Sequence, residues 1–420
     1  MRRSRGLLVF FLLNFLSFIS KSQDTAQKII AGRSNSLDQQ KKPYVILISA
    51  DGFRYDLAEK YQAENLLRLS KHGIRADYMQ SSFPSLTFPN HYSIVTGLYP
   101  AHHGIVDNNF YDPKKKGFYS LGNRKVVTDS SWYGGYPLWV LAEKQKMIAA
   151  SFYWVASEAA IQGIRPTYYY TYNEAIPINR RIEVLKQWLM LEPEKRPHFI
   201  TFYFPEVDHQ EHRYGVDSRE AVEAVHFVDS SIGKMVRTID SLGLPVNYVF
   251  LSDHGMVNID TLHTISLPSG VDTTKFMYTT GMSIVHLYAR DSADVLPAYE
   301  TLRRDAHDYD VYLTGETPTH WHYSKHEDRF NRLGDILLIP HMPKSFNVLH
   351  RRMPVAEHGY DPSFREMHAS FYAWGPAFRK GKKINGFENV NVYPLIAQIL
   401  GLRIDSPIDG KLQTLRSILK

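Results

Sequence analysis

The sequence predicts an α/β protein with a central, mostly parallel β-sheet flanked by helices. Apolar runs rich in β-branched and aromatic residues, such as 44–50, 198–204 and 247–252, alternate with segments of helical period. Runs of this kind are typical of buried parallel strands. Aspartate and histidine follow several of these runs, and ligands of open α/β sheets gather at the carboxyl ends of the strands. The sequence therefore predicts one shared site at one edge of the sheet.

The composition sets limits on size and on chemistry. The chain has 420 residues, which is enough for one large domain with insertions or for two domains. A hydrophobic content of 44% allows a sizeable core. The sequence contains no cysteine, so an exported form must rely on its core or on bound metal instead of disulfides. Any metal site must then be built from His, Asp and Glu.

The N-terminus has the pattern of an export signal. A basic start over 2–5 precedes an apolar run at 6–19, which is too short for an ordinary membrane span. Cleavage after Ser22 would leave 45 basic residues against 43 acidic ones, a net charge of +2 instead of +6. We expect a periplasmic or secreted protein with no stable membrane anchor, an uncleaved anchor being the alternative. The balanced charge gives no reason to expect binding to a nucleic-acid duplex.

The expected organisation is a signal peptide at 1–22, a flexible leader at 23–42 and a single domain at 43–420. Helical and strand periods predict these elements in chain order. The strands lie at 44–50, 74–78, 147–154, 198–204, 247–252 and 369–374, and the helices at 55–71, 90–96, 137–145, 178–191, 217–242 and 390–402. Residues 110–132 have no clear period and are expected to be irregular.

A segment at about 262–345 reads as an inserted α+β subdomain. Its predicted strands are 283–288, 311–313 and 335–339, and its predicted helix is 293–307. Candidate metal ligands lie on both sides of it in the sequence, at Asp253-His254 and at His358. This placement indicates an insertion into the parent sheet and not an independent tail.

The stretch 81–109 is the most informative in the chain. Pro84 and Pro89 restrict the backbone around Thr87, which predicts a stiff turn that presents one hydroxyl before a short helix. A threonine at such a position is, taken alone, more typical of a helix cap. The metal-type ligands elsewhere in the chain favour a chemical role for this hydroxyl.

Six side chains of metal-ligand type stand near strand ends or on one helical turn. They are Asp51, Asp208, Asp253, His212, His254 and His358. Three carboxylates and three imidazoles can hold two divalent ions, with Zn²⁺ the best match and Mn²⁺ possible. A hydroxyl activated at a two-ion site suits in-line phosphoryl transfer. With 19 histidines in the chain, most must be ordinary core or surface residues.

Several ordered motifs resemble the nucleotide pyrophosphatase/phosphodiesterase family of the alkaline phosphatase superfamily. The motifs are Asp51-Gly-Phe-Arg54, Phe83-Pro-Ser-Leu-Thr-Phe-Pro-Asn-His91, Thr96-Gly-Leu-Tyr-Pro100, His103-Gly-Ile105, Asp107-Asn108, Asp253-His-Gly-Met256 and His358-Gly-Tyr360. The resemblance covers about 42–402 and implies an alkaline-phosphatase-like fold in a short, exported, bacterial-type member.

The resemblance also implies roles for individual residues. Two zinc ions (Zn²⁺) would be held, one by Asp208, His212 and His358 and the other by Asp51, Thr87, Asp253 and His254. Thr87 would be the nucleophile that forms a phosphothreonine, and Asn108 would donate to a phosphate oxygen. Phe88 and Tyr172 would stack a nucleotide base. The segment Trp154-Val155-Ala156 departs from the family's usual Trp-Pro-Gly.

The main interpretation is a zinc-dependent phosphodiesterase that acts on small-molecule nucleotides and releases nucleoside 5′-monophosphates. The alternative within the family is a diesterase for choline-headed or other lipid-derived phosphodiesters, which would need a cation-binding pocket. A sulfatase is disfavoured because its modified cysteine or serine, followed by proline and arginine, has no counterpart here. A catalytically silent binding protein on the same fold is the last alternative.

Overall fold

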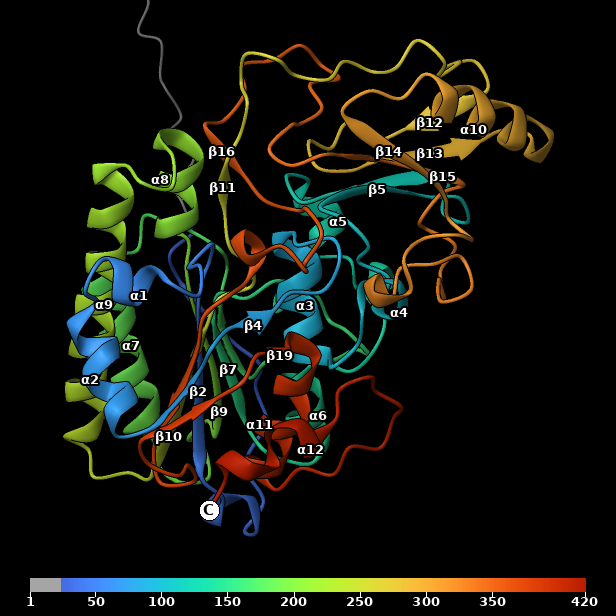
Figure 1. Cartoon of the computed structure of the whole chain (residues 1–420). Helices are drawn as coiled ribbons and strands as arrows, with labels where there is room; N and C mark the ends of the chain where they lie inside the picture. Colours follow the sequence, from blue (N-terminus) through green and yellow to red (C-terminus); the bar gives the residue numbers. More distant parts are fainter. Residues whose placement is uncertain (1–23) are drawn as a thin grey trace, which may run out of the picture.

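The computed structural model describes residues 24–420, and the predicted signal peptide lies outside them (Figure 1). Its main feature is a nine-stranded sheet with the order β1-β8-β7-β9-β2-β10-β17-β3-β18. The strands are β1 (Gln27–Ile29), β2 (Tyr44–Ala50), β3 (Ile74–Ala76), β7 (Ala149–Phe152), β8 (Tyr168–Tyr170), β9 (Phe199–Phe204), β10 (Val246–Leu251), β17 (Phe371–Trp374) and β18 (Lys382–Ile384). The five neighbours from β8 to β10 are all parallel, which confirms the mostly parallel α/β sheet.

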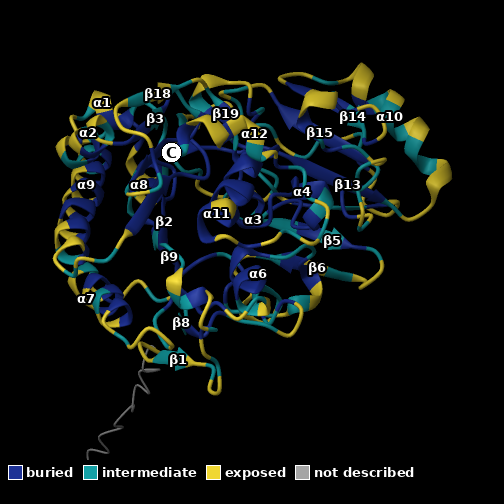
Figure 2. Cartoon of the chain, turned by 90° about the horizontal axis from the view of Figure 1, so that it is seen from below, coloured by how far each residue is buried: buried dark blue, intermediate teal, exposed yellow. Residues whose placement is uncertain are grey.

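Helices cover both faces of this sheet. Along β2, Ile46 and Ile48 face one core with α2 (Glu64–Lys71), α7 (Ile178–Leu189) and α9 (Arg219–Asp240). Val45 and Leu47 face the other core with α3 (Thr87–Thr96), α6 (Leu138–Lys144) and α11 (Val392–Leu400). Because strand side chains alternate between faces, an apolar run buries both sides at once. Figure 2 shows the buried strands between helices with exposed outer faces.

Two expectations about the sheet are wrong. The run at 369–374 forms β17, which is antiparallel to β10 and not parallel, because the chain enters it at the edge where β10 ends, with Ser252 N–H donating to Ser370 O. The leader at 23–42 is not uniformly flexible, since β1 pairs with β8. Asn35 within it is buried, and its amide donates to the carbonyls of Pro193 and Arg196.

Two other expectations need adjustment. The helix predicted over 55–71 is two helices, α1 (Leu57–Lys60) and α2, which are separated at Gln62 by a positive φ of 53°. Residues 110–132, expected to be irregular, contain a hairpin of β5 (Asn109–Asp112) and β6 (Gly117–Ser120). Phe110 and Tyr119 of the hairpin are buried, whereas Phe118 and the Lys114–Lys116 tip are exposed.

The inserted segment forms a second, antiparallel sheet with the order β12-β13-β15-β14. Its elements are β12 (Phe276–Tyr278), β13 (Val285–Ala289), α10 (Val295–Arg304), β14 (Tyr309–Leu313) and β15 (Ile336–Pro340). They share a hydrophobic core of their own, in which Leu302 of α10 packs with Leu287 and Ile336. Figure 1 shows this subdomain beyond one end of the main sheet, next to β5.

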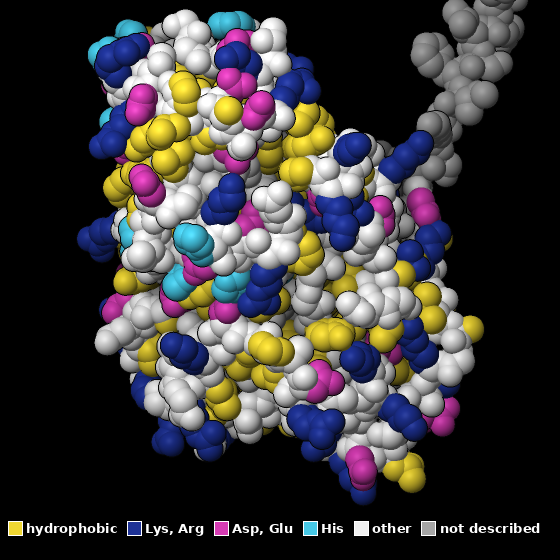
Figure 3. Space-filling view, turned by 90° about the vertical axis from the view of Figure 1, so that its right-hand side faces the viewer, with side chains coloured by type: hydrophobic (Ala, Val, Ile, Leu, Met, Phe, Trp, Pro, Cys, Tyr) yellow, Lys and Arg dark blue, Asp and Glu magenta, His cyan; other side chains and the backbone are white. Residues whose placement is uncertain are grey.

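The described surface carries charges of both signs. On the face in Figure 3, basic and acidic side chains are interspersed, with several histidines between them. Within residues 24–420, no helix has both the length and the apolar character needed to cross a bilayer.

Candidate active site

Three neighbouring parallel strands bring candidate ligands to one edge of the sheet, as predicted. Asp51 directly follows β2, and Asp253 and His254 come just after β10. β9 leads into α8 (Glu206–Tyr214), which presents Asp208 and His212 four residues apart on one turn. These strands are adjacent in the order β9-β2-β10, so their carboxyl ends meet.

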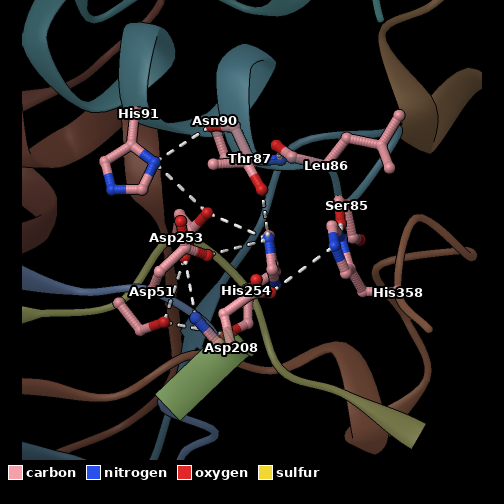
Figure 4. Close-up of polar contacts among 12 residues, drawn as sticks. Asp51, Ser85, Leu86, Thr87, Asn90, His91, Asp208, Asp253, His254 and His358 are labelled. Carbon is pink, nitrogen blue, oxygen red and sulfur yellow. Dashed lines mark hydrogen bonds and ion pairs between the residues drawn. The ribbon is translucent and has the colours of Figure 1, made fainter. Parts of the chain in front are cut away.

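The remaining predicted residues reach this edge from outside the sheet. His358 follows β16 (Ala356–Glu357), which pairs with β11 (Val257–Asn258) in a separate two-stranded ribbon. Thr87 is the first residue of α3, and its hydroxyl lies 3.2 Å from His254 Nε2. Figure 4 shows these side chains converging on one space from the different segments.

Gly52 allows the closest approach within the site. Its φ is +68°, and a Cβ at this position would lie 3.0 Å from the Cα of Asp208. The backbone N–H of Asp208 donates to the carbonyl of Asp51 at 3.2 Å. A glycine after Asp51 therefore lets the end of β2 turn against α8 with the two carboxylates side by side.

The three imidazoles are held in the same way. Each Nδ1 contacts a backbone carbonyl: His212 contacts Ala356 at 2.7 Å, His254 contacts Gly255 at 2.9 Å and His358 contacts Ser85 at 2.8 Å. A carbonyl only accepts, so each Nδ1 carries a proton and each Nε2 is the nitrogen turned toward the carboxylates, where a bound metal would take the place of any proton. This arrangement is common around metal-binding histidines, where the second contact fixes both tautomer and ring orientation.

The free Nε2 atoms lie beside carboxylate oxygens in two groups. Asp208 Oδ1 is 3.3 Å from His212 Nε2 and 3.7 Å from His358 Nε2. His254 Nε2 is 3.0 Å from Asp253 Oδ2 and 3.4 Å from Asp51 Oδ1. The sets Asp208–His212–His358 and Asp51–Asp208–His254 each bring their ligand atoms within 4.8 Å of one another. Such spacing suits a cation at the centre of each set.

The electrostatics of the site also call for cations. One oxygen of each of Asp51, Asp208 and Asp253 is buried without a hydrogen-bond partner. Burial, and then the charges of Asp253 and Asp208, raise the pKa of Asp51 well above its usual value. Burial lowers the pKa of His212, but Asp208 outweighs it and raises that pKa to about 10. Three buried carboxylates with unpaired oxygens are costly unless a positive charge joins them, so these residues fit divalent metal.

Three further residues belong to the site and were not predicted. Tyr203 donates its hydroxyl to Asp51 Oδ2 at 2.6 Å, and His91 Nδ1 lies 3.2 Å from Asp253 Oδ2. Glu357 is buried, accepts from the backbone N–H of His358, and has its second oxygen unpartnered. Tyr203 sits inside an apolar strand, and His91 was noted only as part of a motif. A residue that contacts a candidate metal ligand, and not the metal itself, has no characteristic spacing in the sequence by which it could be found.

Asn108 lies beside Thr87 with its amide orientation fixed. Its Oδ1 accepts the backbone N–H of Phe88 at 3.0 Å. The Nδ2 group therefore remains available to donate, as the sequence prediction for this residue requires.

A cavity of about 620 Å³ opens above the ligands and is lined by both predicted aromatic residues, Phe88 and Tyr172. This volume is within the usual range for small-molecule sites. The Tyr172 ring contacts Tyr153 and Tyr203 edge-on, with centroids 5.1 and 6.0 Å apart, and is 40% exposed. Ala156, where the family motif has glycine, keeps a positive φ of 70°. The backbone of this cavity wall thus takes the left-handed turn that glycine favours.

Comparison with known proteins relates this site to a family. A family model described as "Type I phosphodiesterase / nucleotide pyrophosphatase" matches residues 45–361. The venom phosphodiesterase CdcPDE of Crotalus durissus collilineatus is 33% identical over 390 residues, covering 90% of this chain and 46% of that protein. Ectonucleotide pyrophosphatase/phosphodiesterase family member 1 of Mus musculus is 33% identical over 393 residues, with 90% and 43% covered. This chain thus spans less than half the length of these relatives.

Solved structures show the same fold. The chain superposes on murine ectonucleotide pyrophosphatase / phosphodiesterase 5, an inactive form in complex with AMP, with a TM-score of 0.84 and 25% identity, covering 90% of this chain and all of that one. The human counterpart gives the same TM-score, identity and coverage. Sequence match, fold and the arrangement of acids and histidines agree, and the chain belongs to the type I phosphodiesterase / nucleotide pyrophosphatase family.

Proposed function

We propose that this protein hydrolyses nucleotide phosphodiester and pyrophosphate bonds with two zinc ions and releases nucleoside 5′-monophosphates. The observation that carries the proposal is the position of the Thr87 hydroxyl, 3.2 Å from His254 Nε2 at the floor of the cavity that Phe88 and Tyr172 line. One hydroxyl lies where the two sets of acids and histidines meet the cavity, which is how a nucleophile at a two-ion site would be placed.

The proposed metal ligands follow the two sets of side chains. Asp208, His212 and His358 would hold one ion, and Asp51, Asp253 and His254 would hold the other together with Thr87. Zinc suits a set of nitrogen and carboxylate ligands without thiolate. When bound, the ions would lower the pKa of the Thr87 hydroxyl and neutralise charge on the phosphoryl group.

The proposed reaction has two displacements at phosphorus. Thr87 Oγ1 forms a bond to phosphorus while the bond to the leaving-group oxygen breaks, which leaves the nucleoside monophosphate on Thr87. Water then forms the new P–O bond as the P–Oγ1 bond breaks, and the hydroxyl is restored. Asn108 Nδ2 donates to a non-bridging oxygen, where negative charge grows in each transition state.

Two observations support a nucleotide substrate, one on the cavity and one on a structural relative. Phe88 adjoins Thr87 in sequence and lines the cavity together with Tyr172, so a base that stacks on these rings would hold its 5′-phosphate near the threonine. Stacking on aromatic rings contributes about 1–3 kcal/mol per base. The structural relative in complex with AMP has the same fold.

A diester with a choline head group is the second candidate, because the cavity also contains acids beside aromatic rings. Glu174 accepts from the Tyr172 hydroxyl at 2.8 Å and lines the same space. Rings and a carboxylate together can bind a quaternary ammonium. The other acid of this wall, Glu158, is already paired with Arg124, which leaves Glu174 as the main acid for such a group.

The deciding experiment compares the nitrophenyl ester of thymidine 5′-monophosphate with nitrophenyl phosphorylcholine, with and without a chelator. We expect faster, chelator-sensitive release from the nucleotide ester. Faster release from the choline ester would keep the metal chemistry and move the substrate to lipid head groups. Absence of turnover of both esters would contradict the proposal.

We further propose that the protein is exported, to the periplasm or to the outside of the cell. The basic and apolar N-terminal segment supports this proposal. Fractionation of expressing cells, followed by N-terminal sequencing of the mature protein, would test it.

A further inference from the structure

The inserted subdomain contacts the loop that carries Asn108 at several points, three of which lie close to Asn108 in sequence. Tyr323 donates its hydroxyl to the carbonyl of Val106 at 2.7 Å. Tyr111 N–H donates to the hydroxyl of Tyr288 at 3.2 Å. Between them, His286 Nε2 lies 3.1 Å from Asp107 Oδ2. The subdomain thus holds the chain on both sides of Asn108 but does not touch Asn108 through these contacts.

The contact between His286 and Asp107 is buried on both sides. The His286 side chain is fully buried and that of Asp107 is 3% exposed. Burial of both partners fixes the geometry more tightly than a surface pair would, because neither can exchange its partner for water. His286 is itself anchored on β13, where its Nδ1 donates to Leu333 O at 2.9 Å.

Asp107 passes this constraint to Asn108 through the backbone. Its other oxygen, Oδ1, accepts the N–H of Asn109 at 2.8 Å, which closes a turn around Asn108. The two oxygens of one carboxylate thus join the subdomain to the turn. Asn108 in turn accepts from Phe88 N–H, next to Thr87.

We propose that His286 is a positioning residue for catalysis: through Asp107, it sets the place of the Asn108 amide over the phosphoryl group. This inference rests on the proposed function and gives the inserted subdomain a part in it. Displacement of a group by about 1 Å can cost up to about 10²-fold in rate, so a small shift of this turn matters. Because Asn108 acts mainly in the transition state, the effect belongs in kcat and not in KM.

The test uses two substitutions, each of which keeps a nitrogen donor at the position of one of the two imidazole nitrogens. In His286→Gln the side-chain amide nitrogen can replace Nε2 and still donate to Asp107. In His286→Asn it replaces Nδ1 and reaches Leu333 O, so Asp107 loses its partner. We expect His286→Asn to lower kcat on the thymidine ester about 10-fold with little change in KM, and His286→Gln to recover most of that loss. His341→Asn is the surface control, since His341 pairs with Asp310 in the same sheet with both side chains over half exposed.

Repeating His286→Asn in an Asn108→Ala background separates positioning from general damage. If His286 acts through Asn108, it has no further effect on kcat there. An equal loss in both backgrounds, or equal loss in His286→Asn and His286→Gln, would overturn the inference. If His286→Asn does not fold, Asp107→Asn replaces it, because that change keeps an oxygen for Asn109 and removes the carboxylate facing His286.

Binding of orthovanadate, which mimics the trigonal-bipyramidal transition state at phosphorus, gives a readout that does not need turnover. We expect His286→Asn to weaken vanadate binding, measured by calorimetry, with AMP affinity and metal content unchanged and with recovery in His286→Gln. A wild type that binds vanadate but cleaves neither ester contradicts the proposed function and leaves this comparison intact. Equal vanadate affinity in wild type and His286→Asn contradicts the positioning role.

Discussion

Thr87 is the residue on which the proposed chemistry depends. It opens α3, and its backbone carbonyl lies 3.0 Å from His91 Nδ1 while its hydroxyl faces His254. The residue is thus held by its main chain, and the hydroxyl is left for reaction. Its position also shows why the helix-cap interpretation fails, because the residue that precedes the helix is Leu86 and not Thr87.

Replacing Thr87 tests its proposed role as nucleophile separately from the metal site. We expect Thr87→Ala to lower kcat by at least about 10³-fold, as loss of a nucleophile does in other hydrolases, with folding and metal content kept. Thr87→Ser is the matched control, since it keeps the hydroxyl and should retain measurable turnover. The measurements are ester hydrolysis, metal content and thermal unfolding. Full turnover in Thr87→Ala would mean that water attacks the phosphorus directly.

Tyr203 provides a second test at the residue scale. Its hydroxyl donates to Asp51 Oδ2, and the Asp51 oxygen that lies nearer to His254 is left free. Partners of this kind are worth about 10–100-fold in metal affinity or activity, so we expect Tyr203→Phe to bind zinc more weakly in competition with a chelator. Tyr248→Phe is the control, because it removes another buried hydroxyl, which donates to Asp240 away from the site. Equal zinc affinity in the two variants would exclude this role for Tyr203.

At the scale of elements, the site depends on how β2 ends against α8. The end of β2 and the first turn of α8 approach so closely that a side chain at Gly52 would crowd Asp208. The parallel neighbours β9, β2 and β10 bring their three carboxyl ends together. The β11–β16 ribbon adds His358 from outside the sheet. The site therefore requires that these strand ends, the ribbon, α8 and α3 all pack correctly.

Gly52→Ala tests this approach. The new methyl group would meet the Asp208 backbone at 3.0 Å in addition to straining a φ of +68°. Gly243→Ala has the same φ of +68° with no atom within 4 Å, so it bears only the backbone strain of about 1–2 kcal/mol. We expect Gly52→Ala to destabilise the fold more than Gly243→Ala and to lose zinc affinity, measured by thermal unfolding and chelator competition. Equal effects of the two substitutions would show that the contact with Asp208 is not limiting.

At the scale of the whole molecule, one edge of the main sheet carries a buried group of charges. Asp51, Asp208 and Asp253 are all buried, and one oxygen of each is without a hydrogen bond. An ion that binds only the folded state stabilises it by mass action, by about 4 kcal/mol when its free concentration is a thousand times its dissociation constant. The stability of the fold should therefore depend on metal.

Metal removal tests that dependence. We expect a chelator to lower the unfolding temperature and to abolish ester hydrolysis, because the buried carboxylates then repel one another without a countercharge. Added zinc should restore both, and magnesium should restore less, since it prefers oxygen ligands and octahedral geometry. An unfolding temperature that is unchanged by chelation in a sample shown to have lost its metal would contradict this account.

Much of the fold and of the site could be predicted from the order of residues. Apolar runs fixed the parallel strands, and the acids and histidines after them fixed where ligands gather, because parallel strands share one carboxyl edge. The direction of β17 could not be predicted, since an apolar run looks the same in either direction. The order within residues 24–42 was also missed, because β1 pairs with β8 and Asn35 donates to backbone carbonyls that lie more than 150 residues away in sequence.

The sequence by itself determined the chemical inventory: a thiol-free set of carboxylates and imidazoles, a threonine between two prolines, and glycines where the chain must turn. These are local properties, and local spacing records them. Only the tertiary structure decided which atoms remain free. It showed that carbonyls hold each Nδ1 and leave each Nε2, that Tyr203 reaches Asp51, and that His286 of the inserted subdomain reaches Asp107. Such contacts join segments distant in sequence, and packing in three dimensions alone determines them.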